Sequence, residues 1–158
     1  MVHEIEEQLT QLDPAHAAIY QANAALLMAE LDDLTAEIDA DLAPVKGKGF
    51  VVFHDAYQYF ENRFDMAATG SVTVSPEVLP GAERIRELQE KIQALEVACI
   101  FAEPQFEPKL VATIIENTGT KTGVIDPLGA TIADGPQLYS TLIRNMAASL
   151  KDCLLSTD

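Results

Sequence analysis

Five side chains that can bind protons or metal ions follow short apolar segments of this 158-residue chain. They are His54 and Asp55 after residues 50–53, Ser75 after residues 71–74, Glu103 after residues 98–102, and Asp126 after residues 122–125. One imidazole and several carboxylates suit a borderline cation such as zinc, which accepts both nitrogen and oxygen ligands. The residue types therefore allow a metal site, although a histidine at the end of a strand is more often a hydrogen-bonded structural residue.

Two of these carboxylates also have a structural interpretation. Glu103 and Asp126 each precede a proline. A residue before proline is held in an extended conformation, and its carboxylate can cap the turn that follows. The sequence therefore allows both a capping role and a metal-binding role for these two residues.

Other kinds of active site find little support. The sequence contains no GxxxxGK[ST] or GxGxxG phosphate-binding motif and no GxSxG motif of a nucleophilic serine. A small zinc-dependent hydrolase, with zinc held by His54 and Asp126, is the enzymatic alternative. Only Glu103 and Asp55 are available to supply its third ligand and its base.

The apolar segments that precede these residues are predicted strands. They alternate with helical patterns around residues 57–64, after Pro80-Gly81, after Pro108, and over residues 136–154. This alternation predicts an α/β fold in which a four-stranded parallel sheet has helices on both faces. Ligands of such sheets bind at the carboxyl ends of the strands, which is where the candidate residues lie.

A long helix is predicted before this sheet. Asp13-Pro14 is typical of a helix start, with Asp13 as an N-cap acceptor, and Pro44 and Gly47 end the helix. Shorter helical spacing precedes it at Ile5, Leu9 and Leu12. We therefore divide the chain into a helical arm, residues 1–46, and an α/β lobe, residues 47–158.

Composition excludes several partners. The chain has 25 acidic and 10 basic residues, a formal net charge of −15, which would repel nucleic acids and anionic membranes. No apolar run is long enough to span a bilayer, and the first residues show no signal-peptide core. Cys99 and Cys153, 54 positions apart, form no CxxC motif and are either two thiols or one disulfide.

Three separate motifs resemble one protein family. Residues 47–60 (GKGFVVFHDAYQYF), 101–106 (FAEPQF) and 125–129 (IDPLG) are similar to segments of the ZnuA-like substrate-binding proteins of zinc ABC importers, within the cluster A-I metal-binding family. The resemblance covers the carboxyl-terminal lobe of that family and the long interlobe helix. It implies two α/β lobes joined by this helix, with the metal ion in the cleft between them.

The resemblance also implies a role for each candidate residue. His54 corresponds to the ligand from the second lobe. Manganese-binding relatives have a glutamate at this position, whereas a histidine there favours zinc. Asp126 corresponds to a carboxylate that binds metal directly in the manganese group. Glu103 and Asp55 are expected to support the ligands, and a disulfide between Cys99 and Cys153 is implied together with a periplasmic location.

The implied function is high-affinity zinc uptake, in which the protein captures Zn²⁺ and delivers it to an ABC permease, without enzymatic activity. A manganese- or iron-binding relative is the alternative within the family. The two histidine motifs of the family's first lobe are absent from this sequence. We therefore expect an incomplete site, weak zinc binding by this chain alone, and either a missing first lobe or self-association through the exposed arm and cleft.

Overall fold

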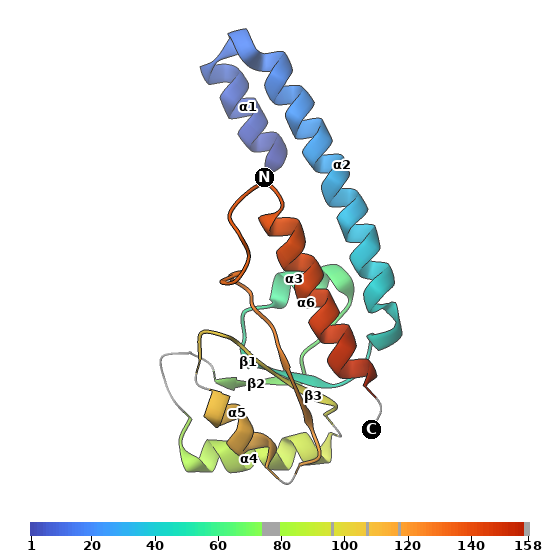
Figure 1. Ribbon diagram of the computed structural model, residues 1–158, viewed down its shortest axis with the longest axis vertical. Helices are drawn as coiled ribbons and strands as arrows, with labels where there is room; N and C mark the ends of the chain where they lie inside the picture. The colour runs from blue at the N-terminus through green and yellow to red at the C-terminus, as the bar shows by residue number, and fades with distance from the viewer. Residues whose placement is uncertain (74–79, 96, 107, 117, 157–158) are drawn as a thin grey trace. The chain divides into compact units, whose positions relative to one another are not determined.

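The computed structural model describes residues 1–73, 80–95, 97–106, 108–116 and 118–156, and Ser75 lies outside these ranges (Figure 1). The chain forms two compact units, residues 1–37 and 38–158. The boundary between them falls within the long helix α2 (Ala17–Leu42). The division into an arm, residues 1–46, and a lobe, residues 47–158, stays a prediction.

The first unit is a pair of helices joined by a tight turn. Helix α1 (Val2–Leu12) is followed by a short 3-10 helix, η1 (Pro14–His16), and then by α2. Asp13 lies at the turn as expected, but its carboxylate makes no capping bond. Instead it accepts hydrogen bonds from the Tyr20 hydroxyl (2.9 Å) and His16 Nδ1 (2.7 Å), which lower the pKa of Asp13.

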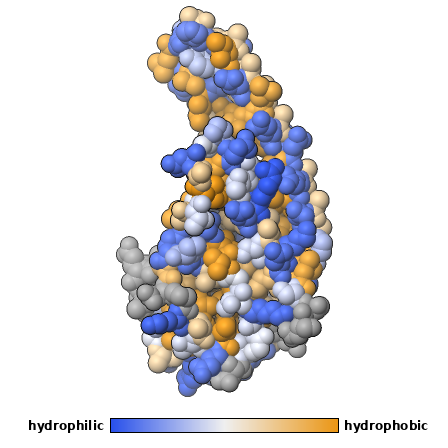
Figure 2. Space-filling view, viewed as in Figure 1, coloured by the Kyte–Doolittle hydropathy of each residue, from blue (hydrophilic) through white to orange (hydrophobic). Residues whose placement is uncertain are grey.

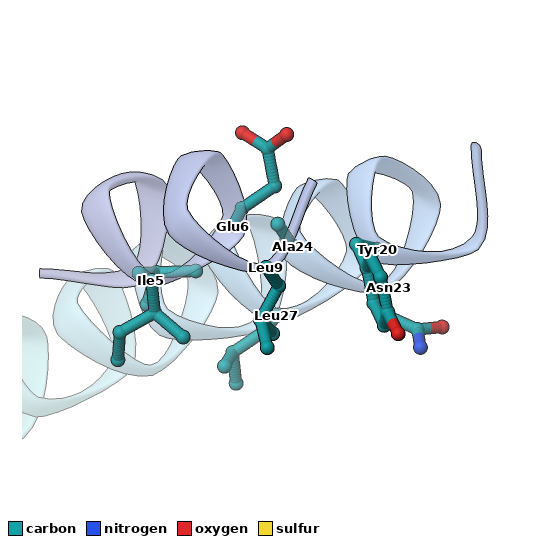
Figure 3. A pocket seen from close by; sticks show the side chains of 8 residues that line it. Ile5, Glu6, Leu9, Tyr20, Asn23, Ala24 and Leu27 are labelled. Carbon is teal, nitrogen blue, oxygen red and sulfur yellow. The ribbon is translucent and has the colours of Figure 1, made fainter. Parts of the chain in front are cut away.

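Apolar side chains gather at the surface of this helical pair (Figure 2). A groove of about 200 Å³ lies between α1 and α2 and is lined mainly by apolar residues. Ile5, Leu9 and Leu27 point to the same side of the helices, whereas the Glu6 carboxylate points away (Figure 3). Leu12 is 82% exposed, so the first unit presents large apolar side chains outside the groove as well.

The second unit contains the sheet. Its strands are β1 (Phe50–His54), β2 (Gly70–Thr73), β3 (Cys99–Ala102) and β4 (Lys121–Val124). They are all parallel and lie in the order β2-β1-β3-β4. The predicted α/β fold with a four-stranded parallel sheet is confirmed.

Helices cover both faces of this sheet (Figure 1). Helices α4 (Ala82–Ala94) and α5 (Pro108–Ile115) lie on one face, and α3 (Gln58–Phe64) and α6 (Leu138–Leu155) lie on the other. Val51 and Phe53 pack in the core beneath α4 and α5. Phe50 and Val52 line a small enclosed cavity beside α6, because successive side chains of a strand point to opposite faces.

The chain enters the sheet through a second 3-10 helix. Helix α2 ends at Leu42, η2 (Ala43–Val45) follows and packs against α6, and Gly47 adopts a φ of +80°. A positive φ is readily adopted by glycine, which has no Cβ. Pro44 and Gly47 thus end the helix as predicted.

A disulfide and a close backbone approach tie β3 and β4 to α6. Cys99 in β3 and Cys153 in α6 are bonded, with 6.2 Å between their Cα atoms, which confirms the implied pairing. A Cβ on Gly123 would lie 2.7 Å from Cδ1 of Phe101 and 3.3 Å from the Cβ of Cys153. Only glycine fits at this position without displacing the aromatic ring.

Candidate metal site

The register of the sheet brings the predicted site residues together at the carboxyl ends of the strands. Val52 pairs with Phe101, so His54, two residues on, lies beside Glu103. Ala102 pairs with Val124, and Asp126 follows two residues later. The carboxyl ends of β1, β3 and β4 therefore carry His54, Glu103 and Asp126, as predicted for a parallel sheet.

His54 and Glu103 form a direct hydrogen bond. His54 Nδ1 lies 2.7 Å from Glu103 Oε1, and the two side chains are 22% and 2% exposed. A carboxylate accepts hydrogen bonds, so Nδ1 is assigned as the donor, and imidazole with its hydrogen on Nδ1 has its lone pair on Nε2. This is the arrangement in which a carboxylate orients a metal-binding histidine.

Aromatic packing fixes the plane of the His54 ring. Phe106 meets it edge to face at 5.9 Å between ring centres, and Phe106 also stacks on Phe53 at 4.5 Å. The Phe106 backbone N–H donates to the Glu103 carbonyl at 3.1 Å. One turn after β3 thus supplies both the carboxylate and the ring that hold His54.

Tyr57 lies next to this pair. The whole residue is 6% exposed, and the centre of its ring is 6.3 Å from that of the His54 ring. The hydroxyl is buried and has no hydrogen-bond partner among the described residues. Burial raises the pKa of Tyr57 far above its usual range, and the nearby Glu103 and Asp126 carboxylates raise it further.

Asp126 organises the loop that follows β4. Its Oδ1 accepts from the backbone N–H groups of Leu128 (3.1 Å) and Gly129 (3.0 Å) and from the Gln105 side chain (3.0 Å). Its Oδ2 accepts from the backbone N–H of Ala130 at 2.6 Å. These bonds are the capping role that the Asp-Pro sequence allowed, and a metal-binding role for Asp126 stays a prediction.

The remaining candidates contribute less to this edge. Asp55 is exposed and has no hydrogen bond or ion pair within the part of the chain that the structure describes. Across the described ranges, no three His, Cys, Asp or Glu side chains converge where they could hold a metal ion. The described residues thus bring His54 and Glu103 together but do not form a complete ligand set.

Sequence reasoning missed the structural roles of Tyr57, Gln105 and Phe106. Tyr57 lies at the start of the helical pattern predicted around residues 57–64, and its polar hydroxyl three residues after His54 is the signal that could have indicated a place in the site. Gln105 and Phe106 follow Glu103-Pro104 directly. Their roles depend on the turn after β3, which brings them back towards Asp126 and His54.

None of the helices within the described ranges is both long enough and apolar enough to cross a membrane.

Comparison with known proteins identifies related chains. A family model described as zinc-uptake complex component A, periplasmic (ZnuA), matches residues 1–153. The high-affinity zinc uptake system protein ZnuA of Brucella abortus (strain 2308) is 59% identical over 151 residues, 96% of this chain and 45% of that protein. The chain thus spans about half the length of the curated relatives it matches.

Solved structures agree with this relationship. A mutant structure of the laminin-binding adhesin (Lmb) from Streptococcus agalactiae has a TM-score of 0.79 at 30% identity, covering 95% of this chain and 56% of that one. A crystal structure of ZnuA has a TM-score of 0.79 at 26% identity, covering 94% and 53%. With the family model extending over residues 1–153, this chain belongs to the ZnuA family of periplasmic zinc-uptake components.

Proposed function

We propose that this chain is the carboxyl-terminal lobe of a periplasmic zinc-binding protein that captures Zn²⁺ as cargo and delivers it to an ABC permease, without catalytic turnover. The observation that carries the proposal is the His54–Glu103 pair at the carboxyl edge of the sheet. The names of the relatives, high-affinity zinc uptake system proteins, agree with it.

His54 is the proposed zinc ligand of this lobe. Its Nε2 keeps the lone pair because Glu103 holds the hydrogen on Nδ1, and the partly exposed side chain leaves the ring near solvent. Asp126 is a proposed second ligand, although its oxygens already accept four hydrogen bonds. Tetrahedral zinc needs four ligands, so the rest come from water or from the other lobe of the whole protein.

Isothermal titration of the metal-free chain with Zn²⁺ tests this proposal. We expect weak binding of one ion per chain. His54→Ala should raise the dissociation constant by at least about tenfold, because losing even a residue that hydrogen-bonds to a metal ligand typically weakens binding by that factor. His3→Ala is the matched control, because His3 is 70% exposed and pairs with Glu6 and Glu7 on its own helix, α1.

Two outcomes would overturn the assignment. Binding that His54→Ala leaves unchanged would remove His54 from the site, and an equal loss in His3→Ala would place zinc on surface histidines. A parallel titration with Mn²⁺ tests the alternative within the family. Because imidazole nitrogen favours zinc over manganese, tighter binding of Mn²⁺ would favour the manganese-binding relative.

The helical pair of residues 1–37 also needs a partner in this proposal. Leu12, Leu26 and Ile19 are more than half exposed there, together with the apolar groove between α1 and α2. Exposed apolar surface of this kind marks interaction sites. We propose that the remaining part of the whole protein covers it, or a second copy of this chain where that part is absent.

A further inference from the structure

The strongest unexplained feature of the candidate metal site is the Tyr57 hydroxyl. It is buried without a hydrogen-bond partner among the described residues, and it is the sole buried side-chain nitrogen or oxygen there in that condition. Leaving such a donor unpaired in the protein interior destabilises the fold. A buried polar group at a candidate site therefore calls for a partner that the site itself supplies.

The neighbouring carboxylate has the complementary need. Glu103 has a side chain that is 2% exposed, and it accepts a hydrogen bond from His54. A buried carboxylate is stable only when several donors face it. Both groups border the His54 ring: the ring centre of Tyr57 lies 6.3 Å from that of His54, and His54 Nδ1 lies 2.7 Å from Glu103 Oε1.

The rest of the Tyr57 side chain is anchored in place. Tyr57 is the residue just before helix α3, and its ring lines a small cavity among apolar side chains that include Val52 and Leu150. Because apolar side chains surround the ring, a hydrogen-bond partner for the hydroxyl must lie at the tip of the Tyr57 side chain. Of the two carboxylates near this tip, Asp126 already accepts four hydrogen bonds, so Glu103 is the better acceptor.

We propose that the Tyr57 hydroxyl donates a hydrogen bond to Glu103 and thereby fixes the carboxylate that holds His54 with its hydrogen on Nδ1. Tyr57 is then a positioning residue. Glu103 then accepts one hydrogen bond from Tyr57 and one from His54, and the two bonds hold its carboxylate against the imidazole. The consequence for zinc rests on the proposed function, because a fixed tautomer keeps Nε2 permanently available to the ion.

Nitrogen-15 NMR of the metal-free chain tests the proposal directly. Long-range proton–nitrogen spectra distinguish a ring protonated on Nδ1 from one protonated on Nε2. We expect His54 to show the Nδ1–H form, and Tyr57→Phe to convert a measurable fraction to the Nε2–H form. The zinc dissociation constant should rise by about tenfold, the lower end of the cost of losing a group outside the ligands.

Two further variants separate positioning from simple loss of packing. Tyr59→Phe removes a hydroxyl two residues away, in helix α3, but Tyr59 is 84% exposed, so this control should leave both measurements unchanged. Glu103→Gln keeps the size of the side chain and removes its charge. If Tyr57 acts through Glu103, adding Tyr57→Phe to Glu103→Gln should cause no further change, because the two changes share one interaction.

The proposal is overturned if Tyr57→Phe and Tyr59→Phe show the same fraction of the Nδ1–H form of His54. It is also overturned if the effects of Tyr57→Phe and Glu103→Gln on that fraction are additive in the double variant. Failure of the proposed function gives a different pattern. In that case no variant binds zinc measurably, while the tautomer of His54 in the metal-free chain still decides the role of Tyr57.

Discussion

Burial of Tyr57 makes the stability of the protein sensitive to alkaline pH. An exposed tyrosine loses its proton near pH 10, whereas burial and the nearby carboxylates keep the pKa of Tyr57 well above that value in the folded state. Above about pH 10 the unfolded chain therefore loses a proton that the folded chain retains. The contribution of Tyr57 to the free energy of unfolding should fall by about 1.4 kcal/mol per pH unit there.

Urea unfolding between pH 9 and pH 11, at about half-unit steps, measures this dependence. Tyr57→Phe should show a shallower loss of stability than the unmodified chain, and the difference should vanish below about pH 9 because Tyr57 is then protonated in both states. Parallel curves for the two chains across the whole range would contradict the prediction.

Residue types predicted which side chains form the candidate metal site, but not the hydrogen bonds between them. The spacing of apolar segments placed His54, Glu103 and Asp126 at one edge, because parallel strands share a direction. Which carboxylate bonds the imidazole depends on strand order, and only the placement of β3 beside β1 puts Glu103 next to His54. The capping bonds of Asp126 depend on the path of the loop after β4.

At the scale of the elements, β3 and α6 pack so closely against β4 that they leave no room for a side chain at Gly123. The Phe101 ring of the neighbouring strand and the Cys153 side chain of α6 occupy the space where a Cβ would lie. Inserting a methyl group into a packed core costs typically about 1–3 kcal/mol. We expect Gly123→Ala to lower the free energy of unfolding by about this amount.

Gly70→Ala is the matched control for this substitution. Gly70 also lies in a strand, β2, but a Cβ there would meet only the flexible end of Lys91, 3.0 Å away. Thermal or urea unfolding of both variants compares them, and the control should stay within about 0.5 kcal/mol of the original chain. Equal losses in the two variants would mean that the Phe101 ring moves aside freely.

Most elements were predictable because their apolar spacing and their proline and glycine signals agree. Pro44 and Gly47 ended the long helix where expected, and each predicted strand in the described ranges exists. Two details were wrong. Strand β4 ends at Val124, before Ile125, and Asp13 bonds His16 and Tyr20 where a helix cap was expected, because side chains one turn ahead compete with the backbone for its carboxylate.

At the scale of the whole molecule, the apolar surface of residues 1–37 should make the chain associate with itself. Sedimentation velocity at increasing protein concentration measures this, and we expect a reversible dimer. Leu12→Glu places a charge on this surface and should weaken the dimer by about tenfold or more, since desolvating an unpaired charge costs over 1.4 kcal/mol.

Leu95→Glu is the control for this measurement. Leu95 is 51% exposed at the end of α4, in the second unit, and its substitution should leave association unchanged. A chain that stays monomeric at every concentration would exclude a second copy as the partner of the helical pair.

The bond between Cys99 and Cys153 has a chemical consequence for the proposed zinc binding by His54. Thiolates are soft ligands that zinc accepts readily, and a pair of them would compete with the imidazole for the same ion. Cys99 opens β3 while Glu103 follows its last residue, so the two sulfurs and the His54 edge lie at opposite ends of one strand. In the disulfide neither sulfur is a thiolate, so the two cysteines do not compete with His54 for a zinc ion.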